Sequence, residues 1–439
     1  MKNKLFNVLV IILLIFSSII IVDKNINSIN YSLITIGNKI IDEGIFTTED
    51  FAWVQNLEYE NINWFLDIII AKIYNIYNFY GIYVFYIILN IIIGYSLFFV
   101  INKESKNKYI SLFLTLITIF LNKNILNNCI QSTTILIFIW IIYFINRLMK
   151  TRKKRYIIYI CLFTILITNI NAKIYPIIFL LFLPYIIKFL YNKIKLFKNN
   201  EKILIKDIDI YTILITIFLV FVFGAVNPLS WSPYMYFFRS KNFYNFDIIY
   251  RLGLLNSFSI CIATFFIILI VVIFCKEKLQ SINFKFNNYI KGSTIIAISV
   301  IIISIGIMAA KNKYAKEFVN TEENPIYAAD YIIENLDLKS LKIYNDYDIG
   351  DYLEFRKIPV LLDSRIELYS NRFNNTAIFY DWYNVHTGNV NFDEMFYDYG
   401  INYSLLKKYD LVCNYIIDND NWKLIYEDKN FVIYERVNI

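Results

Sequence analysis

The chain has 439 residues, of which 58% are apolar and 18% aromatic, and its formal net charge is +7. So high an apolar fraction excludes an ordinary soluble domain and is typical of a protein with several membrane spans. The charge is unevenly divided, because residues 311–439 carry 14 basic and 22 acidic side chains (net −8) and residues 1–310 carry +15. We expect the basic part to meet anionic lipids at the cytoplasmic leaflet, and no pattern indicates a nucleic-acid partner.

Apolar runs of bilayer length recur along the first part of the chain. They begin near residues 5, 81, 107, 128, 156, 174, 208, 252 and 290, which predicts about nine spans of roughly 20 residues each. The first run lacks a small-residue cleavage site, so we interpret it as a retained anchor. Flanks rich in Lys and Arg, above all RLMKTRKKR (147–155), place alternate loops inside. These patterns predict a mainly α-helical, multi-pass protein of the cytoplasmic membrane, with its N-terminus inside and its C-terminus outside.

The cysteines and histidines restrict the chemistry. The five cysteines show no paired spacing, so the sequence predicts neither a disulfide framework nor a thiolate metal site. His386, the single histidine, is interpreted as an ordinary surface residue, and histidine-rich metal or triad chemistry is excluded. Any catalysis must therefore depend on carboxylates.

Residues 23–80 form the longest predicted outer loop, and its length alone indicates a functional segment. Within it, residues 64–76 have the helical spacing of an interfacial helix. TTEDFAW places Glu49 and Asp50 ahead of aromatic side chains, where a carboxylate can take a proton from an acceptor hydroxyl. The alternative is a solvated loop in which Thr48 caps a helix. The tryptophans of the predicted outer segments form an aromatic belt or stack on a sugar or lipid head group; they are Trp53, Trp64 and Trp231.

The composition changes after residue 310, and the remainder alternates helix and strand signals. NPIYAADYIIENL predicts a helix with Pro325 at its first turn. Short strands are predicted in LKIYN, PVLLD, NYSLL, WKLIYED and FVIYERV, the last two joined as a hairpin at 428–430. We therefore predict a transmembrane module over 1–310 and an extracytoplasmic α/β domain over 320–439.

A second acidic constellation lies in YNDYDIGDYLEFRKIPVLLDSRIELY (344–369). Asp346, Asp348 and Asp351 crowd a predicted loop after one strand, and Asp363 with Arg365 ends the next. Ligands of α/β folds bind at the carboxyl ends of strands, so these carboxylates could hold a cation or an amine. The alternative is turn chemistry together with an internal Asp363–Arg365 ion pair.

These segments resemble a family of bacterial multispan proteins classed with the GT-C glycosyltransferases. The likeness is most specific in the tail, through PIYAADYI, IYNDYDIGDYL, IPVLLDSRIELY, YGINYSLL and WKLIYEDKNFVIYER. It is looser in the front, through GNKIIDEGIFTTEDFAW, ENINWFLDII, NINAKIYPIIFLLFLPYI and GAVNPLSWSPYMY. NDYDIGDYL is also distantly similar to the WWDYG signature of oligosaccharyltransferase catalytic subunits, but its tryptophans are absent, so peptide recognition does not follow.

The resemblance implies transfer of a sugar from a polyprenyl-phosphate donor to an envelope glycan or protein on the outer face. The family's first-loop catalytic carboxylate falls on Asp50, with Glu49 next to it. Basic residues then stabilise the leaving phosphate in an inverting displacement. The candidate donor-binding residues are Glu60, Trp64, Arg239 and Lys241, and the candidate acceptor-binding residues are Asp346, Tyr347, Asp348, Asp363 and Arg365. Anchoring at the membrane interface is the alternative role of Arg239 and Lys241. Participation of a divalent cation such as Mg²⁺ or Mn²⁺ stays open.

The chain departs from this family at two positions. Relatives often have histidine where this chain has Asn63 and Asn171. An asparagine can keep a hydrogen bond but cannot move a proton near neutral pH. The departure favours an alternative, a non-catalytic envelope protein that binds a lipid-linked glycan or an assembly partner.

Overall fold

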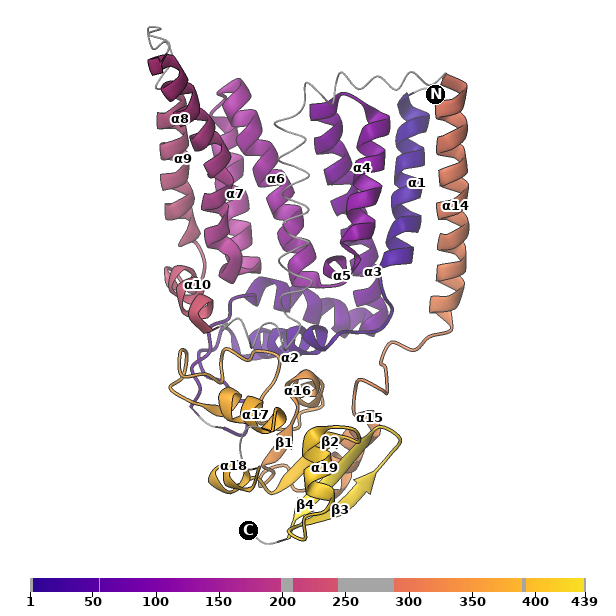
Figure 1. The fold of residues 1–439 in the computed structure, drawn as a ribbon, viewed down its shortest axis with the longest axis vertical. Coiled ribbons are helices and arrows are strands. Elements are labelled where there is room, and N and C mark those ends of the chain that lie inside the picture. Colours follow the sequence, from indigo (N-terminus) through magenta and orange to yellow (C-terminus); the bar gives the residue numbers. More distant parts are fainter. Residues whose placement is uncertain (1–2, 55, 199–207, 244–287, 389–391, 438–439) are drawn as a thin grey trace. The chain divides into compact units, whose positions relative to one another are not determined.

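The computed structural model describes residues 3–54, 56–198, 208–243, 288–388 and 392–437 (Figure 1). The chain divides into two compact units. The described residues of unit 1 fall within Met1–Asp23, Ile82–Phe238 and Asn245–Lys316. Those of unit 2 fall within Lys24–Gly81, Arg239–Tyr244 and Glu317–Ile439. The predicted division assigned the loop 23–80 to the first module, whereas in the structure nearly all of it belongs with the tail.

Unit 1 is helical, and its helices run side by side in Figure 1. It comprises α1 (Asn3–Ile21), the later part of α3 (Trp64–Ser105), α4 (Lys108–Leu121), α5 (Lys123–Leu126), α6 (Cys129–Thr151), α7 (Arg155–Ile170), η1 (Ala172–Phe182), α8 (Leu183–Lys198), α9 (Ile208–Gly224), most of α10 (Ser232–Phe243) and α14 (Asn288–Tyr314). Helix α1 packs against α14 and α4, and α7 packs against α6 and α9. Side chains such as Phe6, Leu97 and Ile139 form a shared apolar core.

Five helices in the described part of the chain are long and apolar enough to cross a membrane. They are Lys4–Ile21, Trp64–Ser105, Cys129–Thr151, Ala172–Tyr191 and Ala297–Tyr314. Three shorter apolar helices, Lys108–Leu121, Arg155–Ile170 and Ile210–Gly224, lie at further predicted spans. The one remaining predicted span, near residue 252, lies outside the described residues. The count of nine therefore stays a prediction.

The first segment of unit 2 contains α2 (Ser28–Glu43) and the beginning of α3. Asn78 has a left-handed backbone (φ 53°) and divides α3 into two legs. The first leg confirms the predicted helix over 64–76, although its place at a membrane interface stays a prediction. Gly37 lets α2 approach this leg, because a Cβ at Gly37 would overlap the Asp67 carbonyl group.

The tail of unit 2 combines a small sheet with short helices. Its elements are α15 (Ile326–Asn335), β1 (Ile343–Asn345), α16 (Tyr347–Phe355), α17 (Ile378–His386), α18 (Phe392–Asp398), β2 (Tyr403–Lys407), α19 (Leu411–Ile417), β3 (Trp422–Glu427) and β4 (Phe431–Arg436). Within the described tail the strand order is β1-β2-β4-β3; β1 is parallel to β2, and the other neighbours are antiparallel. The predicted helix after Pro325, four of the five strands and the hairpin are confirmed.

The prediction of a strand at PVLLD (359–363) is wrong. Val360 makes one isolated bridge to Ala52. Its N–H donates to the Phe51 carbonyl (3.3 Å), and its carbonyl accepts from the Trp53 N–H (3.0 Å). The Asn345 side chain accepts from the Leu361 N–H and donates to the Leu362 carbonyl (2.9 and 2.8 Å). This segment therefore pairs with the first loop and with one side chain of β1.

Two expected local structures are also wrong. The predicted acidic loop after β1 is instead helix α16, with Asp346 at its N-cap position. Gly350 lets this helix lie against the next segment, because a Cβ there would overlap the Leu362 carbonyl oxygen. Thr48 does not cap a helix; it forms an isolated antiparallel bridge with Glu58.

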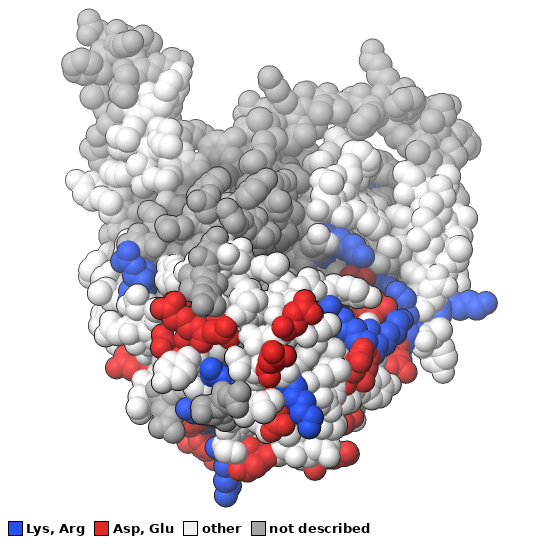
Figure 2. Space-filling view, turned by 60° about the horizontal axis from the view of Figure 1, so that its bottom comes forward, with Lys and Arg blue, Asp and Glu red and all other residues white. Residues whose placement is uncertain are grey.

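Several bonds join the first loop to the tail within unit 2. The indole N–H of Trp53 donates to the Ile343 carbonyl (3.0 Å). The side-chain amide of Asn374 accepts from the Glu58 N–H (2.6 Å) and donates to the Glu58 carbonyl (3.0 Å). Figure 2 shows acidic and basic side chains intermixed over the face turned toward the viewer. The excess acidity of the tail is thus partly balanced by basic side chains on the same face.

Candidate functional site: two carboxylate clusters

The first cluster surrounds Arg365, whose guanidinium group is paired with three carboxylates. It donates to Glu49 (2.7 and 3.2 Å), to Glu354 (2.8 Å) and to Asp363. The Tyr369 hydroxyl donates to the same Asp363 oxygen (2.7 Å). These side chains come from the first loop, from α16 and from the turn that follows it. We call them, together with Asp351, the Arg365 cluster.

Aromatic rings complete the enclosure of the guanidinium group. The rings of Phe51 and Tyr59 lie 5.6 and 5.2 Å from it, within the range of cation–π attraction. Glu49 also accepts from the Phe51 N–H (2.9 Å), so its carboxylate fixes the backbone of its own loop. Glu49, first considered as a catalytic residue, is thus buried in a structural ion pair.

The carboxylates of the Arg365 cluster outnumber its cation, and their pKa values reflect this. Burial raises the pKa of Glu49 and of Glu354, although Arg365 opposes it in both. Burial acts the same way on Asp363, but there Arg365 and hydrogen bonds from its neighbours prevail and lower the pKa. Asp363 is therefore the ionised partner of Arg365, as the alternative interpretation of this segment predicted.

Asp351 lies at the edge of the same cluster. It accepts hydrogen bonds from Ser28 and from the Ser364 hydroxyl (3.0 Å). Burial, followed by the charge of Asp363, raises the pKa of Asp351 to about 6. Oxygens of Asp351, Glu354 and Asp363 lie within 4.8 Å of one another, a spacing that could suit a metal ion. Because Arg365 already donates to two of these carboxylates, we assign the cluster to internal charge balance.

Asp50, the first candidate for catalysis, is accessible where Glu49 is not. Its side chain is 60% exposed and is paired with the ammonium group of Lys39 on α2. Lys39 in turn lies over the rings of Phe46 and Phe51 (4.4 and 5.1 Å to the centroids). The aromatic side chains next to Asp50 thus hold its cation in place.

The predicted donor-binding residues come partly together. Arg239 is far from Glu60 in the sequence but is paired with it. The guanidinium group of Arg239 also lies 4.9 Å from the centre of the Phe373 ring. Trp64 begins α3 beside Phe65. Lys241 lies in α10, but its side chain is outside the described residues.

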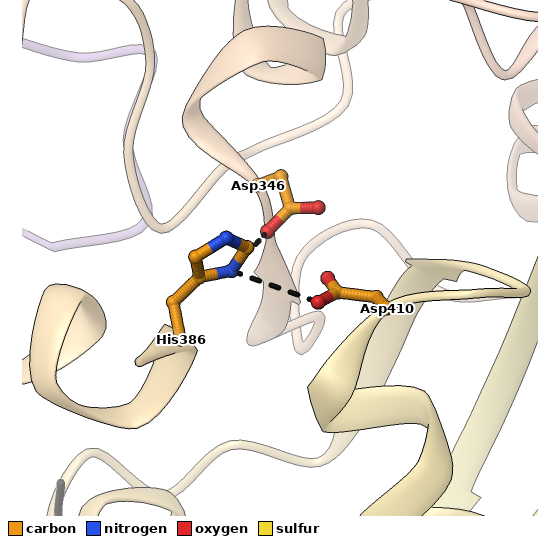
Figure 3. Close-up of side chains that lie close together, drawn as sticks. All are labelled: Asp346, His386 and Asp410. Carbon is orange, nitrogen blue, oxygen red and sulfur yellow. Dashed lines mark ion pairs between the residues drawn. The ribbon is translucent and has the colours of Figure 1, made fainter. Parts of the chain in front are cut away.

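The second cluster contains Asp346, His386 and Asp410 (Figure 3). Asp346 directly follows β1, and Asp410 follows β2 by three residues, so both lie at the carboxyl edge of the parallel pair. His386 Nδ1 lies 3.6 Å from an oxygen of Asp346 and 3.7 Å from one of Asp410. Burial, together with the charges of Asp410 and Asp348, raises the pKa of Asp346 well above its usual range. We call these three residues the His386 cluster.

The expected acidic constellation is therefore divided between two places. Asp346 belongs to the His386 cluster, Asp351 to the Arg365 cluster, and Asp348 pairs with Lys407 (2.6 Å). Tyr347 packs edge-on against Trp382 (5.4 Å between ring centres). His386, expected to be an ordinary surface residue, has a side chain that is 37% exposed, but it also stacks on Trp382 and lies between two carboxylates.

Sequence reasoning missed Asp410 and the pairing of Glu49 with Arg365. A signal for Asp410 was present, because LKIYN and NYSLL were predicted strands, and carboxylates that follow neighbouring parallel strands share one edge. No signal in the sequence pointed to His386 or to a contact between residues 316 positions apart.

No known protein-family model matches the chain, and no curated protein matches its sequence.

Proposed function

We propose that the chain is a multi-pass membrane glycosyltransferase that transfers a sugar from a polyprenyl-phosphate donor to an envelope acceptor on the outer face. One observation carries the proposal: an exposed carboxylate, Asp50, follows directly after Glu49, which is fixed by Arg365. A general base must be both reachable by substrate and held in place. Asp50 combines the two properties, since its own side chain is open and its loop is anchored.

The proposed reaction is an inverting displacement. Asp50 takes the proton of the acceptor hydroxyl, the acceptor oxygen forms a bond to the anomeric carbon, and the bond from that carbon to the phosphate oxygen breaks. Arg239 stabilises the negative charge on the leaving phosphate, which replaces Glu60 as the partner of its guanidinium group. Glu60 keeps the guanidinium group oriented until the donor arrives.

The candidate membrane spans fit a lipid-linked donor, and the proposal places the enzyme in the cytoplasmic membrane. The N-terminus lies inside and unit 2 outside, as the Lys- and Arg-rich flanks predict. With this orientation, Asp50 faces the side on which envelope polymers are assembled.

The test is complementation of a deletion strain by an Asp50→Asn variant, with the envelope glycan as readout. Loss of a positioned general base lowers a rate by about 10²–10⁴-fold, so the variant should not restore the glycan. Asp42→Asn, which alters an exposed carboxylate on the same segment, is the matched control and should restore it. Lys39→Gln removes the same ion pair but keeps the base, and should cost much less.

Asn63 and Asn171 favour the non-catalytic alternative, a protein that binds a lipid-linked glycan. The Asn171 amide donates to the Thr134 hydroxyl (3.0 Å), an interaction that transfers no proton. A binding protein would tolerate the near-isosteric Asp50→Asn change. Full complementation by this variant, and by the Glu49→Gln and Asp50→Asn double variant, would contradict the catalytic proposal.

A further inference from the structure

The His386 cluster contains a buried carboxylate oxygen that lacks a hydrogen bond. The side chain of Asp346 is only 8% exposed, and its Oδ1 has no hydrogen-bond partner among the described residues. The same holds for His386 Nδ1 and for Asp410 Oδ2. Buried polar atoms are almost always paired in folded proteins, because an unpaired one costs its full desolvation free energy. In Figure 3, Asp346 points at the imidazole ring, and its unpaired Oδ1 lies 3.6 Å from the unpaired Nδ1 of His386.

The charge around the cluster is also unbalanced. Lys407, at the end of β2, is paired with Asp348 (2.6 Å), so this neighbouring pair is neutral as a whole. Asp346 and Asp410 then carry a formal charge of −2 when both are ionised, while a neutral imidazole contributes none. One dication would balance this charge. The Arg365 cluster differs, because its guanidinium group already supplies a fixed positive charge to its carboxylates.

The distances fit a bridging ion better than a hydrogen bond. His386 Nδ1 is 3.6 and 3.7 Å from the two carboxylate oxygens, longer than a normal hydrogen bond. Two ligand atoms that each lie about 2.1 Å from a metal ion can be up to about 4.2 Å apart. The observed gaps correspond to angles of about 120° at such an ion, about 10° wider than the ideal tetrahedral angle. One ligand atom from each of the three residues lies within 4.8 Å of the others.

The ring of His386 is held for this role. It stacks on Trp382 at 4.9 Å with an interplanar angle of 17°. Asp346 and Asp410 occupy the N-cap positions of α16 and α19, but neither makes a side-chain capping bond. Neither carboxylate is therefore committed to the first turn of its own helix, although Asp and Asn at such positions usually bond that turn.

We propose that Asp346, His386 and Asp410 bind a divalent transition-metal ion through Nδ1 and one oxygen of each carboxylate. A donor set of one imidazole and two carboxylates suits Zn²⁺ or Mn²⁺ better than Mg²⁺ or Ca²⁺, which prefer oxygen alone. The ion ties the end of α17 to the carboxyl edge of β1 and β2, and a fourth position is left for water or a ligand. This proposal does not rest on the proposed glycosyl transfer.

The test uses the full chain in detergent, freed of metal by a chelator and then titrated with Zn²⁺ alone. Ligands that bind only the folded state raise its unfolding temperature, so Zn²⁺ should stabilise the wild-type protein against heat. Metal analysis after dialysis should find about one retained ion per chain. Asp346→Asn and His386→Ala should abolish the thermal shift and weaken binding by about 10-fold or more.

Asp398→Asn is the matched control, because it alters an exposed carboxylate of the same unit and should keep the wild-type response. Asp346→Asn is near-isosteric, so its metal-free form should fold and allow a valid comparison. The proposal is overturned if Zn²⁺ gives no thermal shift with the wild-type protein. It is equally overturned if Asp346→Asn and His386→Ala keep the shift in full, since the ion then binds elsewhere.

Discussion

The two carboxylate clusters of unit 2 differ in whether they contain a cation that balances their buried negative charge. The Arg365 cluster joins the first loop to the tail and contains its own cation. The His386 cluster lies within the tail and contains an imidazole in place of a guanidinium group. Carboxylates that are paired with an internal cation form a structural ion network. Carboxylates that lack such a cation form a site that can bind an external cation. Counting carboxylates alone would rank the two clusters in the opposite order.

Removing the cation of the Arg365 cluster should have the largest effect on stability. Arg365→Met leaves Glu49, Glu354 and Asp363 buried without their partner, and breaking a buried pair in this way typically costs about 3–5 kcal/mol. Equilibrium chemical unfolding of the detergent-solubilised protein measures this loss. Arg356→Met, which breaks the more exposed pair with Asp330, should cost about 1 kcal/mol or less. Equal losses in the two variants would contradict the assigned role of Arg365.

The second prediction concerns pH and Asp351. Its pKa is about 6 in the folded protein and 3.8 as the unperturbed reference value, so the folded state binds the extra proton between these values. The stability that this group contributes is complete below about pH 4 and is lost as the pH rises through 6, by at most about 3 kcal/mol. Asp351→Asn should remove this part of the pH dependence, as seen in unfolding free energies measured from pH 4 to 7. The prediction fails if wild type and variant keep parallel profiles, while Asp398→Asn should follow the wild type.

The predictable parts of unit 2 were those controlled by local pattern. The helix after Pro325, the strand before Asp346 and the hairpin at 428–430 each have a period and a turn signal within a few residues. Helix bounds in unit 1 likewise follow local caps, such as Asn128, whose side chain accepts from the Gln131 N–H (3.1 Å). These features need no knowledge of distant residues.

The parts that could not be predicted depend on long-range pairing. PVLLD has the composition of a strand, but its hydrogen bonds go to Phe51, Trp53 and Asn345. The three aspartates at 346, 348 and 351 are close in sequence, yet helix α16 directs them to different partners. The partner of Glu49 lies 316 residues away, a separation at which a single sequence carries no periodic signal.

The first loop and the tail share one ion network through Glu49 and Arg365. A double-mutant cycle with Glu49→Gln, Arg365→Met and the double variant tests it most directly, by equilibrium unfolding of the full chain. The structure predicts a coupling free energy of about 1–3 kcal/mol, so the double variant loses less than the sum of the single losses. Additivity within about 0.5 kcal/mol would contradict a direct contact and would separate the loop from the tail.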